Sequence, residues 1–231
     1  AITGGTTISA SGQDITLDEA TSTFGTLALT GANVAVTENA ATDLAASTVS
    51  GTLGVTSTGV VTDSGTLAIT GATTISASGQ DIPRDGAAST SGTLALTGSN
   101  VAVTENAAMD LGASTIGGTA NFNSTSNVIT DSGTLAITGA TTINAGTADI
   151  TLDQAASTFG ALALTGANVA VTENAATDLA ASTVSGTLGV TSTGAVTDSG
   201  TLAITGATTI SASGQDITLD DAASTFGTLA L

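Results

Sequence analysis

The sequence predicts an all-β fold, specifically a right-handed parallel β-helix (a β-solenoid) with about three coils in each 67-residue repeat. Two observations lead to this prediction. The chain repeats itself with a long and nearly constant period, which is typical of solenoids and other arrays. Within each repeat, short runs of residues alternate between apolar and polar side chains and are bounded by Gly, Asn, Asp or Ser, as strands and turns are.

The repeat is visible in the tetrapeptide Ala-Ile-Thr-Gly, which begins at Ala1, Ala68, Ala136 and Ala203. Residues 27–59 are also identical to residues 162–194. We therefore expect a single continuous solenoid segment over residues 1–231, cut from a longer chain. Its repeats one, two and three and its partial fourth repeat span residues 1–67, 68–135, 136–202 and 203–231.

The apolar runs are the expected strands. About nine of them, each four to six residues long, occur in a repeat, which corresponds to three coils of three strands and about 22 residues per coil. The uneven spacing also allows a coil of about 20 residues. In the run from Gly25 to Glu38, alternation predicts which side chains face the core: inward Leu27, Leu29, Val34 and Val36, and outward Thr26, Ala28, Thr30 and Ala35.

Two other folds fit the sequence less well. A β-propeller or a tandem β-sandwich needs hairpin turns and usually aromatic anchors, but Asp85-Gly86 is the lone hairpin signal and aromatic residues are 2% of the chain. The Ala-rich residues 39–47 could form a helical turn. So short a segment is not a stable helix on its own, so we expect strand and turn there.

Repeat two departs from the others at one place. Arg84 stands where the other repeats have Leu, and Ser91 replaces a repeated phenylalanine that we expect to plug a corner of the coil, namely Phe24, Phe159 and Phe226. An unpaired arginine is costly to bury. The sequence therefore predicts that residues 83–91 bulge outward and interrupt the stack.

The charge of the chain restricts its partners. The formal net charge is -18 and the only basic residue is Arg84. Such a surface repels nucleic acid and anionic lipid and attracts divalent cations or basic partners. No apolar run approaches the roughly 18 residues of a membrane-spanning helix, so we expect no membrane insertion, and the absence of Cys excludes disulfides and thiolate metal sites.

The acidic residues recur with the repeat, and we expect most of them to form a solvated acidic face that keeps the rod soluble. The equivalent sets are Asp14, Asp81, Asp149 and Asp216; Asp18, Asp85, Asp153 and Asp220; Glu38, Glu105 and Glu173; Asp43, Asp110 and Asp178; and Asp63, Asp131 and Asp198. Calcium binding is the alternative, because calcium prefers oxygen ligands. Its best candidate ligands are Asp14, Asp18 and Glu19, and no other cofactor is expected.

The composition argues against an enzyme. Without His, Cys or Lys, catalytic triads and Schiff-base chemistry are unavailable. Paired carboxylates could hydrolyse glycosides, but these carboxylates repeat with the architecture, whereas an active site would be unique. A polysaccharide-active β-helix enzyme is therefore a remote alternative. An ice-binding solenoid is another, suggested by the threonine pairs at 21 and 23, 56 and 58, and 191 and 193.

Two runs, DLAASTVSGTL (residues 43–53) and DSGTLAITGATTI (residues 63–75), resemble the repeats of giant exported bacterial proteins of the filamentous haemagglutinin type. The resemblance covers the whole chain. It implies a long right-handed β-helix on or outside a Gram-negative cell, which acts as an adhesin, a stalk or a filament.

The function expected from this resemblance is a structural stalk or filament segment of a secreted, adhesin-like surface protein. The alternative is a calcium-stabilised or directly ligand-binding adhesive array. Open coil ends predict end-to-end self-association into a filament through strand addition. A host-cell or glycan ligand would be bound through other domains of the parent protein.

Overall fold

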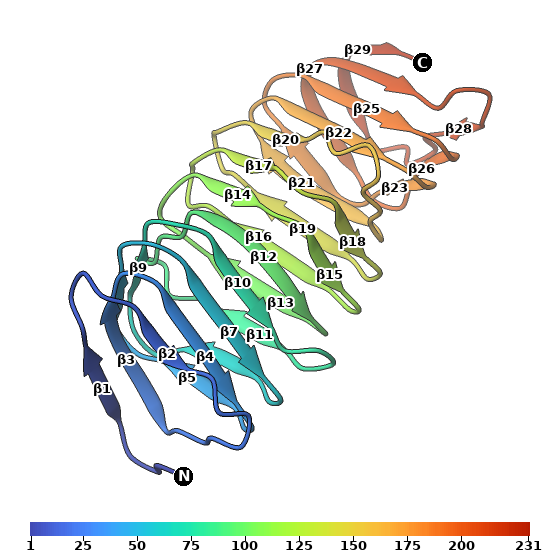
Figure 1. Cartoon of the computed structure of the whole chain (residues 1–231). Coiled ribbons are helices and arrows are strands. Elements are labelled where there is room, and N and C mark those ends of the chain that lie inside the picture. Colours follow the sequence, from blue (N-terminus) through green and yellow to red (C-terminus); the bar gives the residue numbers. More distant parts are fainter.

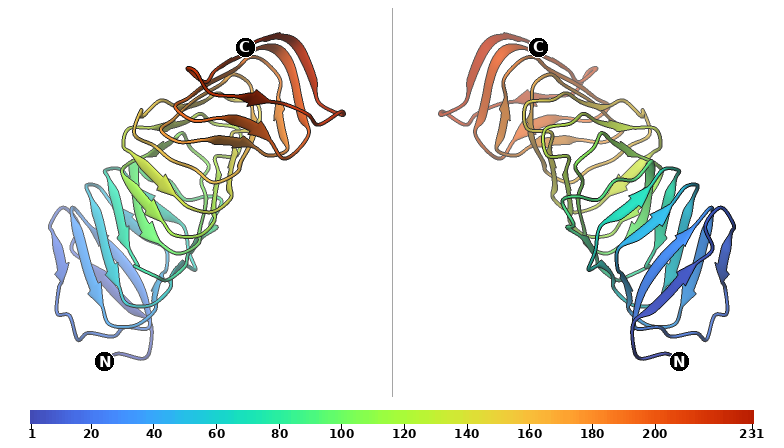
Figure 2. Two further views of the ribbon diagram at one scale, coloured as in Figure 1. Left: turned by 90° about the vertical axis from the view of Figure 1, so that its right-hand side faces the viewer. Right: turned by 90° about the vertical axis from the view of Figure 1, so that its left-hand side faces the viewer.

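The computed structural model describes all residues from 1 to 231, and it is a parallel β-solenoid of about 11 turns without helices. The chain winds steadily from one end of an elongated rod to the other, and its termini lie at opposite ends (Figures 1 and 2). All 29 strands pair in parallel with strands of the neighbouring coils. The predicted fold class is confirmed, and no helix is present that could cross a membrane.

Two long walls run the length of the rod. Wall 1 consists of β2(Ile15–Leu17), β4(Val34–Glu38), β7(Leu53–Ser57), β10(Thr73–Ser76), β12(Thr93–Gly98), β14(Met109–Leu111), β17(Ile129–Asp131), β20(Ile150–Leu152), β22(Val169–Glu173), β25(Leu188–Ser192) and β27(Leu202–Ser211). Wall 2 consists of β1(Thr6–Ser9), β3(Thr26–Gly31), β5(Thr42–Leu44), β8(Val61–Asp63), β11(Ile82–Arg84), β13(Val101–Thr104), β16(Ala120–Asn123), β19(Thr141–Asn144), β21(Leu162–Gly166), β23(Thr177–Leu179), β26(Val196–Asp198) and β28(Ile217–Thr218). The remaining strands are β6(Ser47–Val49), β9(Leu67–Ile69), β15(Ser114–Ile116), β18(Leu135–Ile137), β24(Ser182–Val184) and β29(Thr225–Ala230).

Coil length sets how the repeats are placed on these walls. The step between paired positions varies, from a short one that joins Leu27 to Leu44 to a long one that joins Ala68 to Thr90. Seven coils lead from Leu27 to Leu164, which gives an average coil of about 20 residues. The structure therefore adopts the shorter of the two coil lengths that the sequence allows, and two repeats contain about seven coils. The positions that stack on one another between Leu27 and Leu164, one in each coil, are Leu44, Asp63, Arg84, Val103, Phe122 and Ile143.

One repeat therefore spans about three and a half coils, so the next repeat begins on the opposite wall. The equivalent strands β3, β12 and β21 illustrate this, because β3 and β21 lie in wall 2 whereas β12 lies in wall 1. Repeats one and three thus present the same sequence on the same wall, and repeat two presents it on the other wall.

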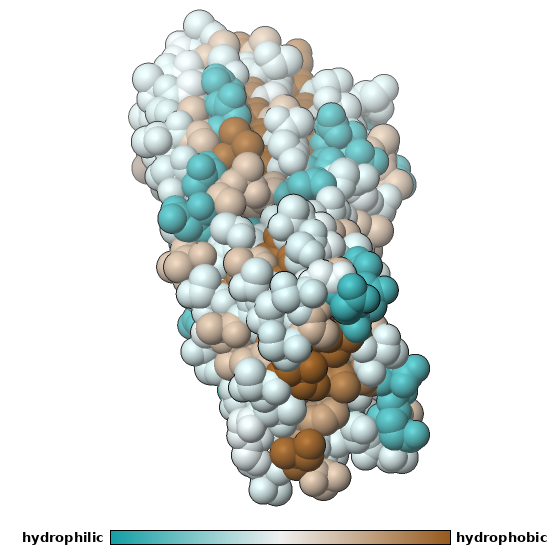
Figure 3. Space-filling view, turned by 60° about the vertical axis from the view of Figure 1, so that its left-hand side comes forward, coloured by the Kyte–Doolittle hydropathy of each residue, from teal (hydrophilic) through white to brown (hydrophobic).

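The core is a stack of small and medium-sized apolar side chains. It contains 45 buried residues in one continuous cluster. Leu27, Leu29, Val34 and Val36 are at most 2% exposed, and the four residues predicted to face outward are more exposed, so the predicted alternation is confirmed. The Ala-rich residues 39–47 form turns and strands β5 and β6, as expected. The face in Figure 3 is dominated by residues of intermediate hydropathy, with separate hydrophilic and hydrophobic patches.

The recurring glycines lie where neighbouring coils approach closely. A Cβ atom at Gly92 would lie 2.5 Å from the carbonyl oxygen of Gly71, and one at Gly71 would lie 2.6 Å from that of Gly51. Real Cβ atoms do not come so close to backbone atoms. Gly51, Gly71 and Gly92 therefore form a column in which Gly71 and Gly92 lack side chains because the preceding coil occupies the space.

One prediction for repeat two is wrong. Residues 83–91 do not bulge out of the stack. Strand β11 pairs in register with β13, and the side chain of Arg84 points into the solenoid with 1% exposure. Its neighbours Ser91 and Glu105 make this burial possible.

Candidate functional site

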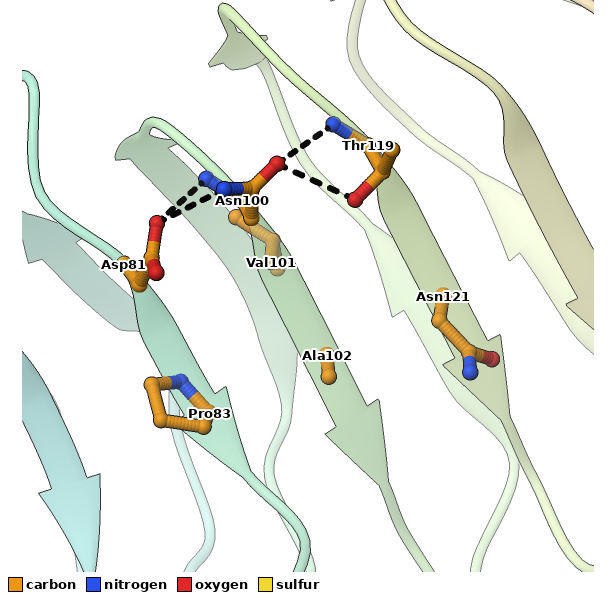
Figure 4. Close-up of a pocket in the computed structure, with 7 residues that line it drawn as sticks. All are labelled: Asp81, Pro83, Asn100, Val101, Ala102, Thr119 and Asn121. Atoms are coloured by element: carbon orange, nitrogen blue, oxygen red, sulfur yellow. Dashed lines mark hydrogen bonds between the residues drawn. The ribbon is translucent and has the colours of Figure 1, made fainter.

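A ladder of hydrogen bonds crosses three successive coils on the surface of repeat two. Asp81 Oδ1 accepts hydrogen bonds from the backbone N–H of Asn100 at 3.0 Å and from its side-chain Nδ2 at 2.9 Å. Asn100 Oδ1 in turn accepts from the backbone N–H of Thr119 at 3.0 Å and from its hydroxyl at 3.1 Å (Figure 4). Each residue sits directly before a strand of wall 2, so the ladder fixes the corners of β11, β13 and β16 relative to one another.

Repeats one and three carry the same ladder at wall 1. Its members are Asp14, Asn33 and Thr52 in repeat one, and Asp149, Asn168 and Thr187 in repeat three. Because the spacing between members matches one coil, the three side chains occupy one corner in three consecutive coils. The recurring Asp thus has a structural role that spacing alone did not reveal.

The calcium candidates Asp14, Asp18 and Glu19 do not form one group in the structure. Asp14 precedes β2 and its Oδ1 is occupied by Asn33, whereas Asp18 and Glu19 follow that strand and are exposed. Glu19 accepts a hydrogen bond from the hydroxyl of Thr21 at 3.1 Å. No group of three or more acidic side chains in the structure is placed to hold a metal ion.

Beside the ladder of repeat two lies a shallow pocket of about 300 Å³. Pro83, Ala102 and Asn121 face outward on the neighbouring strands β11, β13 and β16, and they are aligned across the strands (Figure 4). Pro83 and Asn121 form its two sides, and the small Ala102 forms the floor between them. The structure contains no other pocket. The equivalent residues of repeats one and three are Thr16 and Gly54, and Thr151 and Gly189.

The recurring glutamates are buried, which corrects part of the predicted acidic face. Glu38, Glu105 and Glu173 are at most 1% exposed. Glu38 Oε1 accepts the backbone N–H of Phe24 at 2.6 Å, and Glu173 Oε1 accepts that of Phe159 at 2.8 Å. These carboxyls therefore satisfy a backbone donor at a corner of the coil, a need that alternation patterns do not show. Burial raises the pKa of Glu173, and the Phe159 N–H opposes that rise.

In repeat two the same corner holds a buried ion pair. Ser91 replaces the phenylalanine and leaves room for the Arg84 guanidinium, whose Nη2 lies 3.3 Å from Ser91 Oγ and 3.9 Å from Glu105 Oε1. Glu105 also accepts the backbone N–H of Ser91 at 3.2 Å. Asp63 precedes Arg84 by one coil in the same column. The changes at Arg84 and Ser91 belong together, because the arginine needs the volume that the phenylalanine vacates as well as the carboxylates of Glu105 and Asp63.

Burial dominates the ionisation of this cluster. It lowers the pKa of Arg84, against the opposing effect of Glu105 and then Asp63. It raises the pKa of Glu105, although the hydrogen bonds from Ser91 and the charge of Arg84 work in the other direction. The pKa of Asp63 is also raised by burial and lowered in part by Arg84. The cluster is enclosed, so its chemistry concerns stability and not contact with a ligand.

Comparison with known proteins gives one match. A family model described as "Repeats of unknown function (DUF5649)" matches residues 1–30, 31–97, 98–165 and 166–231, and so covers the whole chain. Its two internal full units, residues 31–97 and 98–165, have the period seen in the sequence with a different starting point. No curated protein and no solved structure matches the chain.

Proposed function

The chain belongs to the DUF5649 repeat family, and from that premise we propose that it is a structural stalk or filament segment of a secreted, adhesin-like bacterial surface protein. In this proposal the segment lies outside a Gram-negative cell, has no catalytic role, and holds a binding domain of the parent protein away from the cell. Any host-cell or glycan ligand binds to that other domain, and copies associate end to end.

The supporting observation is the use of the recurring polar residues. The Asp–Asn–Thr ladder joins three successive coils in each full repeat. The buried glutamates cap backbone N–H groups at the corners. The ladder side chains and the buried glutamates therefore hold neighbouring coils together. Further repeats can extend such a stack without changing any existing coil. With about 4.8 Å between strands, the stacked coils make a rod of roughly 50 Å.

The test is a deletion of residues 31–165 from the full-length parent protein. This removes about seven coils and joins Thr30 of β3 to Gly166 of β21, which both lie in wall 2. Strand β22 of wall 1 then follows β3, as β4 does in the intact chain. A stalk should become shorter by roughly 34 Å in electron micrographs, while cells still attach. Loss of attachment with unchanged surface expression would contradict the proposal and favour direct binding by the repeats.

A further inference from the structure

We propose that the pocket of repeat two binds a lysine side chain of a basic partner, with the ammonium group on Asp81 and the stem between Pro83 and Asn121. This inference goes beyond a stalk function, because it gives one repeat a recognition role that the others lack. It depends on three features of the structure: an oriented carboxylate, a small apolar floor with two sides, and a strongly anionic chain.

The Asp81 carboxylate has a fixed orientation and one oxygen without a hydrogen bond. Asp81 Oδ1 accepts both hydrogen bonds from Asn100, which hold the group at the edge of the pocket. No protein donor is bonded to Oδ2, and Asp81 is exposed. An orientation fixed by neighbouring bonds prepares a group for a ligand, because less freedom is lost on binding.

The shape suits an unbranched chain. Pro83 and Asn121 are separated by the strand that carries Ala102, so about 10 Å, or two strand spacings, separate their backbones. The ring of Pro83 and the methyl group of Ala102 give an apolar surface for methylene groups. The side-chain amide of Asn121 makes no hydrogen bond within the protein, so it is free to bond the backbone of the bound peptide (Figure 4).

The charge of the chain selects a cation. The formal net charge is -18, and Arg84, the only basic side chain, is buried and paired with Glu105. An anionic ligand would be repelled by this field, whereas a cation is attracted from a distance. Lysine combines a compact ammonium group with a four-carbon apolar stem, which matches a carboxylate beside an apolar floor.

The chain itself supplies a matched control. The double variant P83T/N121G installs the residues that occupy these positions in repeats one and three, so it removes the sides of the pocket and keeps the net charge. D81N keeps an Oδ1 acceptor for the ladder and removes only the charge. Circular dichroism confirms that both variants fold before binding is measured.

The experiment is a titration of the full chain with N-acetyl-lysine methylamide, followed by amide NMR shifts at Val101 and Ala102. We expect saturable binding in the millimolar range that weakens up to about fivefold in D81N, as expected for an exposed ion pair. The shifts should vanish in P83T/N121G, and the norleucine analogue, which has no ammonium group, should bind more weakly than lysine by at least the factor seen in D81N.

Three results would overturn the proposal. Lysine shifts that persist in P83T/N121G would show diffuse attraction to an acidic rod. Equal binding of the norleucine analogue would show that the carboxylate is not used. Absence of saturable binding, or saturable binding of a neutral sugar in its place, would show that the pocket does not accept lysine. A purely structural stalk would survive any of these outcomes, so this test is independent of the previous one.

Discussion

Exchange of Arg84 and Ser91 for the residues of repeats one and three tests how the buried ion pair is accommodated. In R84L, Glu105 and Asp63 lose their cation and the space left by Ser91 stays empty. Removal of one partner of a buried pair costs about 3–5 kcal/mol of the free energy of unfolding. In S91F, the new ring competes with the guanidinium 3.3 Å from Ser91 Oγ, and such overpacking costs about 1–3 kcal/mol.

The double variant R84L/S91F should behave quite differently. It recreates the leucine and phenylalanine of repeats one and three, where Glu38 and Glu173 stay buried without a cation and each accepts a backbone N–H. The double variant should therefore recover most of the stability that each single variant loses. The two substitutions are therefore expected to be non-additive, with a coupling energy above about 2 kcal/mol. For a chain of this size, about 1 kcal/mol shifts the melting temperature by about 2–4 °C.

Urea and thermal unfolding of the four proteins at pH 7, followed by far-UV circular dichroism, measure this coupling. Additive losses would refute the view that Arg84 occupies the volume of the missing phenyl ring. The reverse exchange in repeat three gives a control. L152R alone should be severely destabilising, whereas L152R/F159S places the arginine near Glu173 and should recover most of the loss.

Three further predictions concern the close approach of coils at Gly92, the ionisation of Glu173 and the binding of calcium. G92A should destabilise the rod by about 1–3 kcal/mol, because its Cβ would lie 2.5 Å from the Gly71 carbonyl oxygen, whereas G5A, with nothing within 4 Å, should be nearly silent in the same melting assay. Burial raises the pKa of Glu173 above its ordinary value of 4.5, so the folded state binds the proton more tightly than the unfolded state. The contribution of Glu173 to stability should therefore be largest below pH 4.5 and be lost as the pH rises through the raised pKa. The melting temperature should therefore increase from pH 8 to pH 5, and E173Q, which cannot ionise, should flatten this profile; an unchanged slope would exclude Glu173 as a source. If calcium stabilises the rod through Asp14, Asp18 and Glu19, a chelator should lower the melting temperature, and an identical midpoint removes that alternative.

The sequence predicted the architecture well because stacking is encoded locally. Alternation placed Leu27 and Val34 correctly in the core. The coil length was less accessible, because the coils differ in length and do not divide a repeat evenly.

The polar residues were harder to place than the apolar ones. Glu38 looked like one more surface carboxylate, since a sequence does not show that a corner N–H needs an internal acceptor. Arg84 can be buried because Ser91 leaves space for it and Glu105 in the next coil pairs with it. The prediction that Arg84 would be excluded from the core considered only the free-energy cost of burying an unpaired arginine. The signal was nevertheless present: two departures from the repeat, at 84 and 91, occurred together.

The half-coil mismatch between repeat and winding has a consequence for how such proteins change length. Insertion or loss of one repeat unit rotates everything beyond it by about half a revolution around the rod axis, so a domain carried there would point to the other side. A change of two units, about seven coils, restores the original heading. Recombination between near-identical units could thus alter the direction of a distal domain as well as its reach, with every coil along the way left intact.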